Sequence, residues 1–237
     1  MLTLDGVQVS FGGVSALKGV SMTVAAGETV GLVGPNGAGK TTLFNVISGI
    51  VRPTAGNITF RGQSVLKAPE WKRARMGIGR SFQIARPLHH CTVRENLIVA
   101  QRFGAGRIDH QRIDEILDLL KLGHKADRDA VSELALTEHK ALEVGKALAT
   151  DPHLLLLDEV LAGLETNGKR AFMEQLALVR DRFNLAMVVI EHDIPTISAL
   201  CPRVVVLNFG EIIAEGPPAA VFRNPEVVRS YTGEAAA

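Results

Sequence analysis

Unbroken apolar runs and amphipathic segments occupy different parts of this chain. The runs, which are typical of strands buried on both faces of a parallel sheet, lie at residues 28–33, 154–157, 185–190 and 204–207. Shorter β-rich segments lie at residues 2–9, 20–24 and 57–60. The turn at residues 208–210 leads into residues 211–214 and predicts a hairpin. Together these patterns predict an α/β body with an antiparallel β edge.

From about residue 86 to residue 149 the pattern becomes helical. Residues 93–100 and 108–122 carry apolar side chains on one face, and the clearest set is Ile113, Ile116, Leu117 and Leu120. We expect Gly123 to end the second of these helices, because glycine readily takes the positive φ of a helix C-terminus. A third amphipathic helix, around residues 141–148, is expected to stop before Asp151-Pro152. The tail at residues 234–237 has the composition of a disordered end.

A glycine-rich loop follows the apolar run 28–33 and matches the pattern G-x-x-x-x-G-K-[ST]. Its residues are Gly34, Pro35, Asn36, Gly37, Ala38, Gly39, Lys40 and Thr41. Helically spaced apolar residues come next, and Gly49 stands where that helix would end. Glycines let backbone N–H groups approach a triphosphate, and the helix N-terminus adds its positive dipole end. Strand, loop and helix in this order indicate a nucleotide-binding P-loop, in which Lys40 reaches the β- and γ-phosphates and the Thr41 hydroxyl binds Mg²⁺.

Two further apolar runs end in polar residues that suit phosphate chemistry. Asp158 and Glu159 directly follow four consecutive leucines, at the strand end where doubly wound sheets place ligand-contacting residues. Asp158 would hold Mg²⁺ through water and Glu159 would polarise the attacking water, unless the strand simply exits into acidic solvent-facing residues. His192 follows the run 185–190 and could contact the γ-phosphate and position that water. The alternative is an ordinary capped or solvated histidine.

Composition excludes several other classes of protein. The chain has 237 residues, of which 46% are hydrophobic and 22% charged, as in an ordinary globular protein. A net charge of +1 gives no reason to expect a nucleic-acid partner. Cys91 and Cys201 stand apart without metal-like spacing, which favours a reducing cytosolic compartment. No segment resembles a signal peptide or approaches the roughly 20 apolar residues of a spanning helix, so we expect any membrane role to come through a partner.

The combination of GPNGAGKTT, Gln83, LLLLDE and His192, in that order, resembles the ATP-binding cassette (ABC) ATPases. The resemblance implies a P-loop NTPase core with an antiparallel β subdomain and an inserted helical subdomain. The core would comprise residues 1–83 and 151–237 of one nucleotide-binding domain, and the helical subdomain residues 84–150. It implies ATP and Mg²⁺ as ligands and extends the phosphate loop to Thr42. Gln83 would sense Mg²⁺ and the γ-phosphate while linking to a membrane partner, and Phe11 would stack on adenine.

A finer resemblance is to the ATPases of branched-chain amino acid importers. It rests on Phe11-Gly12-Gly13, on residues 159–164 and on a C-terminal segment that contains Asn224-Pro225-Glu226 and Tyr231. It implies a subunit on the cytoplasmic face of the cell membrane that hydrolyses ATP to drive transmembrane permease subunits. Importers of urea or short amides remain an alternative substrate class. The same motifs would also suit a non-transport soluble ABC ATPase or a regulatory nucleotide-binding subunit with low turnover.

The chain departs from the family at its LSGGQ signature, where it reads Leu134-Ala135-Leu136-Thr137-Glu138. Ala135 lacks the serine hydroxyl, Thr137 adds a Cβ where the backbone should approach phosphate, and Glu138 places a negative charge near a helix N-terminus. Glu165 similarly replaces the usual aspartate of the D-loop. In the family's head-to-tail dimer this signature serves the partner's ATP, so we expect poor hydrolysis there. A heterodimer with a second ABC ATPase is therefore favoured over a homodimer, although neutral drift would also explain the change.

The basic run from Trp71 to Arg80 precedes Gln83 and allows two interpretations. It is a candidate docking region for the membrane partner. A solvated charged face explains it equally well.

Overall fold

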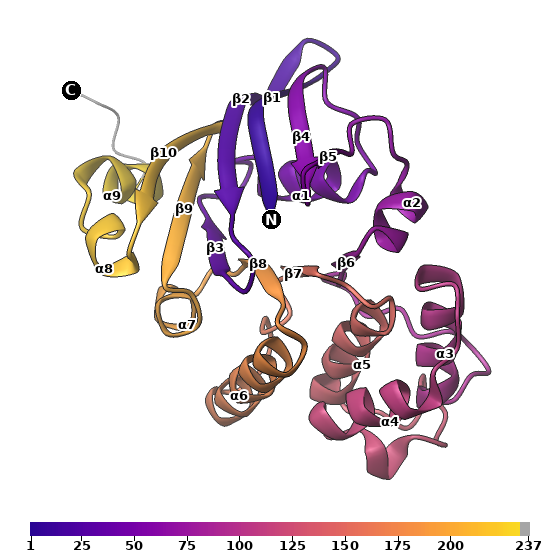
Figure 1. The fold of residues 1–237 in the computed structure, drawn as a ribbon. Helices are drawn as coiled ribbons and strands as arrows, with labels where there is room; N and C mark the ends of the chain where they lie inside the picture. Colours follow the sequence, from indigo (N-terminus) through magenta and orange to yellow (C-terminus); the bar gives the residue numbers. More distant parts are fainter. Residues whose placement is uncertain (233–237) are drawn as a thin grey trace. The chain divides into compact units, whose positions relative to one another are not determined.

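Residues 1–232 are described in a computed structural model, in which the chain divides into two units (Figure 1). The first unit contains residues 1–70 and the described residues from 188 onward. The second unit contains residues 71–187. Strand β8 (Ala186–Ile190) crosses the boundary between them.

A four-stranded antiparallel sheet opens the first unit. Its strands are β1 (Leu2–Phe11), β2 (Val14–Val24), β4 (Ala55–Phe60) and β5 (Gln63–Ser64), in the order β2-β1-β4-β5. Strand β1 alternates between buried and exposed residues, with Leu2, Leu4, Val7 and Val9 on the buried side. This alternation is what a sheet with one covered face requires. Both β1 and β2 are longer than the sequence predicted.

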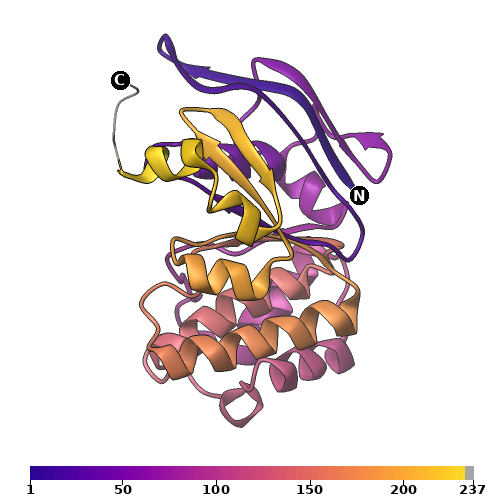
Figure 2. The same ribbon diagram turned by 90° about the vertical axis from the view of Figure 1, so that its left-hand side faces the viewer.

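The first unit also holds a parallel pair of strands with the P-loop at its end. Strand β3 (Thr29–Val33) is wholly buried and pairs in parallel with β9 (Arg203–Asn208), which forms the predicted hairpin with β10 (Glu211–Gly216). Helix α1 (Lys40–Ser48) follows the loop and ends at Gly49 with φ 90°, as predicted. Helix α7 (Ile194–Leu200) packs on β3, while α8 (Pro218–Val221) and α9 (Pro225–Thr232) lie beside β10 (Figure 2).

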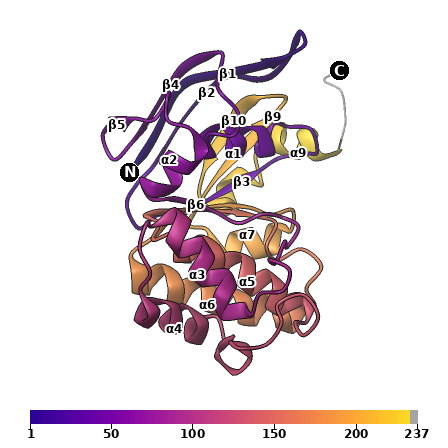
Figure 3. The same cartoon turned by 90° about the vertical axis from the view of Figure 1, so that its right-hand side faces the viewer.

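Helices predominate in the second unit (Figure 3). Helix α5 (Leu136–Ala149) contacts α3 (Val93–Gly104) and α4 (His110–Leu119), and it also packs on two parallel strands, β6 (Ile78–Arg80) and β7 (Leu154–Asp158). Helix α2 (Glu70–Arg75) stands at the start of the unit, and α6 (Thr166–Phe183) contacts α4. Strand β7 is wholly buried, so its leucines belong to the core. Helix α5 thus covers part of the strand that carries Asp158.

The structure confirms the predicted α/β fold class with an antiparallel sheet and a helical segment, and it corrects two details. Helix α4 does not end at Gly123: it ends at Leu119, Lys121 takes the positive φ of 56°, and Gly123 begins a short 3₁₀ turn (Gly123–Lys125). Helix α6 was not predicted at all, although its buried residues follow a helical period. The division at residues 84 and 150 stays a prediction, and the tail prediction for 234–237 falls outside the described residues.

Across residues 1–232, no helix is both long enough and apolar enough to span a bilayer.

Candidate nucleotide-binding site

Two glycines give the P-loop a backbone path that other residues could not follow. Gly34 has φ 146°, and a Cβ built on it would lie 2.0 Å from the carbonyl oxygen of Leu207. Gly39 has φ 106°, and its Cβ would lie 2.8 Å from the carbonyl oxygen of Ala16. A side chain at either position would collide with backbone, which is much harder to move than the end of a side chain. The loop therefore lies in close contact with the backbone of Leu207 at Gly34 and with that of Ala16 at Gly39.

The start of helix α1 is suited to an anion. Its N-cap residue is Gly39, no side chain caps the first turn, and no acidic residue stands there. The first backbone N–H groups of a helix have no partner within the helix, and they carry the positive end of its dipole. Thr41 is exposed in this turn, whereas Lys40 is buried and donates from Nζ to the carbonyl oxygens of Gly34 (2.6 Å) and Pro35 (2.9 Å). These groups suit a polyphosphate, and the role of the Thr41 hydroxyl toward Mg²⁺ stays a prediction.

The β9–β10 turn holds the P-loop in place. The N–H of Gly210 donates to the carbonyl oxygen of Ala38 at 2.9 Å, and the N–H of Lys18 donates to the carbonyl oxygen of Gly210 at 2.9 Å. The turn itself takes positive φ at Phe209 (45°) and Gly210 (83°). A chain segment about 170 residues after the P-loop thus fixes its central carbonyl. Local sequence patterns give no sign of this contact.

The first unit contains two other predicted site residues. Phe11 closes β1 before the Gly12-Gly13 turn and is 53% exposed, as a ring that stacks on a base would need to be. His192 follows β8 and is exposed, two residues before helix α7. Their roles toward ATP stay predictions.

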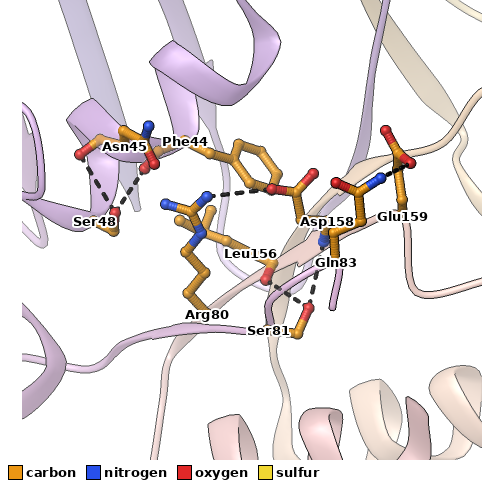
Figure 4. Close-up of polar contacts among 9 residues, drawn as sticks. All are labelled: Phe44, Asn45, Ser48, Arg80, Ser81, Gln83, Leu156, Asp158 and Glu159. Atoms are coloured by element: carbon orange, nitrogen blue, oxygen red, sulfur yellow. Dashed lines mark hydrogen bonds and ion pairs between the residues drawn. The ribbon is translucent and has the colours of Figure 1, made fainter. Parts of the chain in front are cut away.

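In the second unit, Asp158 closes β7 within a dense set of contacts (Figure 4). Its Oδ2 accepts a hydrogen bond from Arg80 Nη2 at 3.2 Å, and each of these side chains is 8% exposed. Its backbone N–H donates to Ser81 Oγ at 3.3 Å. Arg80 and Ser81 were not predicted as site residues. Their only sequence signal is that they stand three and two positions before Gln83.

Gln83 and Glu159 contact each other directly (Figure 4). Gln83 Nε2 donates to Glu159 Oε2 at 2.6 Å. Glu159 has a positive φ of 51°, an uncommon conformation for a residue with a side chain and one often found at functional sites. Lys140 Nζ stabilises this arrangement, because it donates to the carbonyl oxygens of Gln83 (3.0 Å) and Glu159 (3.1 Å). Sequence reasoning also missed Lys140, which lies buried on α5.

The basic run at 71–80 is neither a uniform charged face nor a uniform docking surface. Trp71 and Lys72 are exposed, whereas Arg73 is 2% exposed and Arg80 pairs with Asp158. The accessible part of the run is therefore its beginning, which includes Trp71 and Lys72. The docking role stays a prediction, restricted to that part.

The altered signature forms the N-terminus of helix α5. Ala135 is the N-cap and offers no side-chain acceptor, while Leu136 is 55% exposed where the family has glycine. Glu138 turns back, and its Oε2 accepts from the Ala135 N–H at 2.7 Å and from Lys125 Nζ at 2.6 Å. Burial raises the pKa of Glu138, but these bonds and the nearby positive charges outweigh it, so the pKa lies below its ordinary value. The expected repulsion of phosphate by Glu138 is thus largely neutralised by Lys125.

Comparison with known proteins settles the family. The family model of the ABC transporter domain matches residues 17–162. This chain belongs to the ABC transporter family. It is accordingly an ATP-binding subunit and an ATPase. A second model, described as a branched-chain amino acid ATP-binding cassette transporter, matches residues 211–237.

Individual relatives extend this ABC ATPase assignment over the whole chain. The branched-chain amino acid transport ATP-binding protein LivG of Escherichia coli K12 is 36% identical over 99% of this chain and 98% of its own. BraF of Pseudomonas aeruginosa is 34% identical over the same shares. A crystal structure of the ADP conformation of MJ1267, an ATP-binding cassette of an ABC transporter, has a TM-score of 0.89 at 30% identity and covers 99% of both chains. The resemblance to branched-chain importer ATPases is confirmed.

Proposed function

We propose that this ABC ATPase drives the import of branched-chain amino acids through membrane permease subunits, working at the cytoplasmic face of the cell membrane. The observation that carries the proposal is the match of residues 211–237 to the branched-chain transporter model, outside the segment common to ABC ATPases. The 36% identity with LivG over nearly the full chain supports the same substrate class.

We assign the steps of ATP hydrolysis to the P-loop, to Asp158 and Glu159, and to Gln83 and His192. The P-loop residues 34–42 bind the phosphates, and Lys40 offsets the negative charge that spreads over the γ-phosphoryl oxygens during in-line attack. Glu159 accepts the proton of the attacking water, with His192 donating a hydrogen bond that holds the reacting groups. Thr41, Asp158 and Gln83 would hold Mg²⁺, which would supply positive charge to offset the charge that develops on the phosphates.

The signature of this chain favours a heterodimer. With Lys125 on Glu138, the features that disfavour phosphate reduce to the missing hydroxyl of Ala135 and the Cβ groups of Leu136 and Thr137. A second ABC ATPase with an intact signature would complete the site at this chain's own P-loop. The partner's ATP would face the altered signature and turn over slowly.

The test is a pull-down of the tagged chain from detergent-solubilised native membranes, with identification of the copurifying chains and assay of ATP hydrolysis. We expect permease subunits and a second, different ABC ATPase. A permease with this ATPase alone would contradict the heterodimer, and recovery without any membrane protein would contradict the transport role. Transport of labelled leucine by the purified complex in proteoliposomes then tests the substrate class, and transport of urea instead of leucine would refute it.

A further inference from the structure

The contact between Arg80 and Asp158 places a fixed cation on the carboxylate to which we assign Mg²⁺. The two side chains are buried to the same degree and joined by a 3.2 Å ion pair (Figure 4). We propose that Arg80 is a built-in counter-cation of Asp158, which occupies this carboxylate until Mg²⁺ arrives with the nucleotide and thereby sets the Mg²⁺ concentration at which nucleotide binds. The inference rests on the proposed role of Asp158.

Because Arg80 and Mg²⁺ are both positively charged, we expect them to compete for the Asp158 carboxylate, and we do not expect Arg80 to help Mg²⁺ bind. Burial of a carboxylate costs free energy that a neighbouring positive charge offsets, and Arg80 places such a charge on Asp158. Mg²⁺ bound through this carboxylate would supply that charge itself. Arg80 and Mg²⁺ at one carboxylate would repel each other, and the repulsion is weakly screened in a buried site. Each cation therefore lowers the affinity of Asp158 for the other.

The Arg80 side chain has a second favourable contact besides the ion pair, with the ring of Phe82. Arg80 ends β6 and pairs with Leu156, two residues before Asp158, so its side chain must extend along the strand direction to reach the carboxylate. Its guanidinium carbon lies 5.4 Å from the ring centre of Phe82. A guanidinium is attracted to an aromatic face at this distance. We expect this contact with Phe82 to favour Arg80 after its guanidinium has moved away from Asp158.

Backbone contacts hold the strand ends together independently of the ion pair. Ser81 N–H donates to the carbonyl oxygen of Leu156 at 2.9 Å, and the N–H of Asp158 donates to Ser81 Oγ at 3.3 Å. Movement of the Arg80 side chain therefore does not require β6 to separate from β7. The same backbone bonds should keep β6 paired with β7 in a variant that is neutral at position 80, although the loss of its ion pair with buried Asp158 lowers the stability of that variant.

The experiment measures binding of a fluorescent ATP analogue to the purified chain as Mg²⁺ is titrated. Loss of a charged hydrogen bond of this kind corresponds to roughly a 10- to 100-fold change in an equilibrium constant. We expect Arg80→Gln to lower the half-saturating Mg²⁺ concentration about ten-fold or more. Arg80→Lys, which keeps the charge, is the matched control and should stay within about three-fold of the unsubstituted chain.

Two results would overturn the inference. An unchanged Mg²⁺ requirement in Arg80→Gln would mean that the ion pair does not compete, and a raised requirement would mean that Arg80 supports the metal site. Asp158→Asn separates this from the proposed function: if it leaves the Mg²⁺ dependence intact, the assignment of Asp158 itself is wrong. Arg80→Met serves as the neutral variant if Arg80→Gln does not fold, as judged from its thermal unfolding without Mg²⁺ or nucleotide.

Discussion

Replacing Ala135 by serine should stabilise helix α5 and raise ATP turnover through two separate effects. Ala135 already has the extended backbone of an N-cap, with φ −75° and ψ 166°. Its N–H donates to the carboxylate of Glu138 three residues later, which is one half of a capping box. A serine hydroxyl would accept the N–H of Glu138 and complete the other half. The same hydroxyl keeps its proton to donate to a phosphate of the opposing subunit.

The magnitude follows from known capping energies. Exchange of alanine for serine at an N-cap is worth about 1 kcal/mol, within a range of roughly 0.5–2 kcal/mol. In a chain of this size such a gain raises Tm by about 2–4 °C. A serine hydroxyl at position 135 that donates a hydrogen bond to the phosphate in the transition state should raise the rate of phosphate release about ten-fold or more. Combining Ala135→Ser with Thr137→Gly should increase turnover further, because the backbone can then approach phosphate more closely.

The assays are thermal unfolding and phosphate release of the purified chain, at matched concentrations because dimerisation brings the signature to the site. Ala135→Gly is the control: glycine is nearly as good an N-cap as serine but carries no hydroxyl. It should raise Tm without raising turnover. Equal turnover in both variants would refute the hydroxyl role, as would a double variant that binds ATP normally and shows no gain. An unchanged Tm in Ala135→Ser would refute the capping argument.

Two further predictions follow from the titrating groups. The pKa of Glu138 is lower in the folded chain, so its ionised form stabilises the fold above its ordinary pKa, and this contribution is lost as pH falls through the lower folded value. Lys125→Met should therefore reduce the free energy of unfolding more at pH 7 than at pH 3. Equal losses at the two pH values would contradict this. Burial, with the charge of Glu191 as a second cause, raises the pKa of Cys201 to about 12, so an alkylating reagent at pH 8 should label Cys91 first and modify both cysteines only after unfolding. Rapid native labelling of both cysteines, followed by mass spectrometry, would show that Cys201 is accessible.

The elements that carry the motifs could be predicted because their signals are local. The P-loop requires glycine at particular positions, and the collisions at Gly34 and Gly39 show why those positions allow nothing larger. The run of leucines before Asp158 reflects burial on both faces of β7, which a short apolar segment reveals by itself. In both cases neighbouring residues in the sequence determine the structure.

The contacts that surround the motifs could not be predicted, since they join distant parts of the chain. The bond from Gly210 to Ala38 and the ion pair from Arg80 to Asp158 depend on which strands lie side by side. The end of α4 was misplaced because Lys121, a residue that seldom takes positive φ, does so here. Helix α6 had a usable signal, because Phe172, Leu176 and Val179 recur at helical spacing on its buried side.

The most direct test of the central claim is phosphate release by the purified chain and by its Glu159→Gln variant, with ATP binding measured in the same preparations. Glutamine keeps the size of the side chain and can still accept the bond from Gln83, but it cannot take a proton from water. We predict that the unsubstituted chain releases phosphate and that Glu159→Gln binds ATP equally well while losing about 100-fold or more of this turnover. Undiminished phosphate release by Glu159→Gln would contradict the role assigned to this carboxylate and to the site built around it.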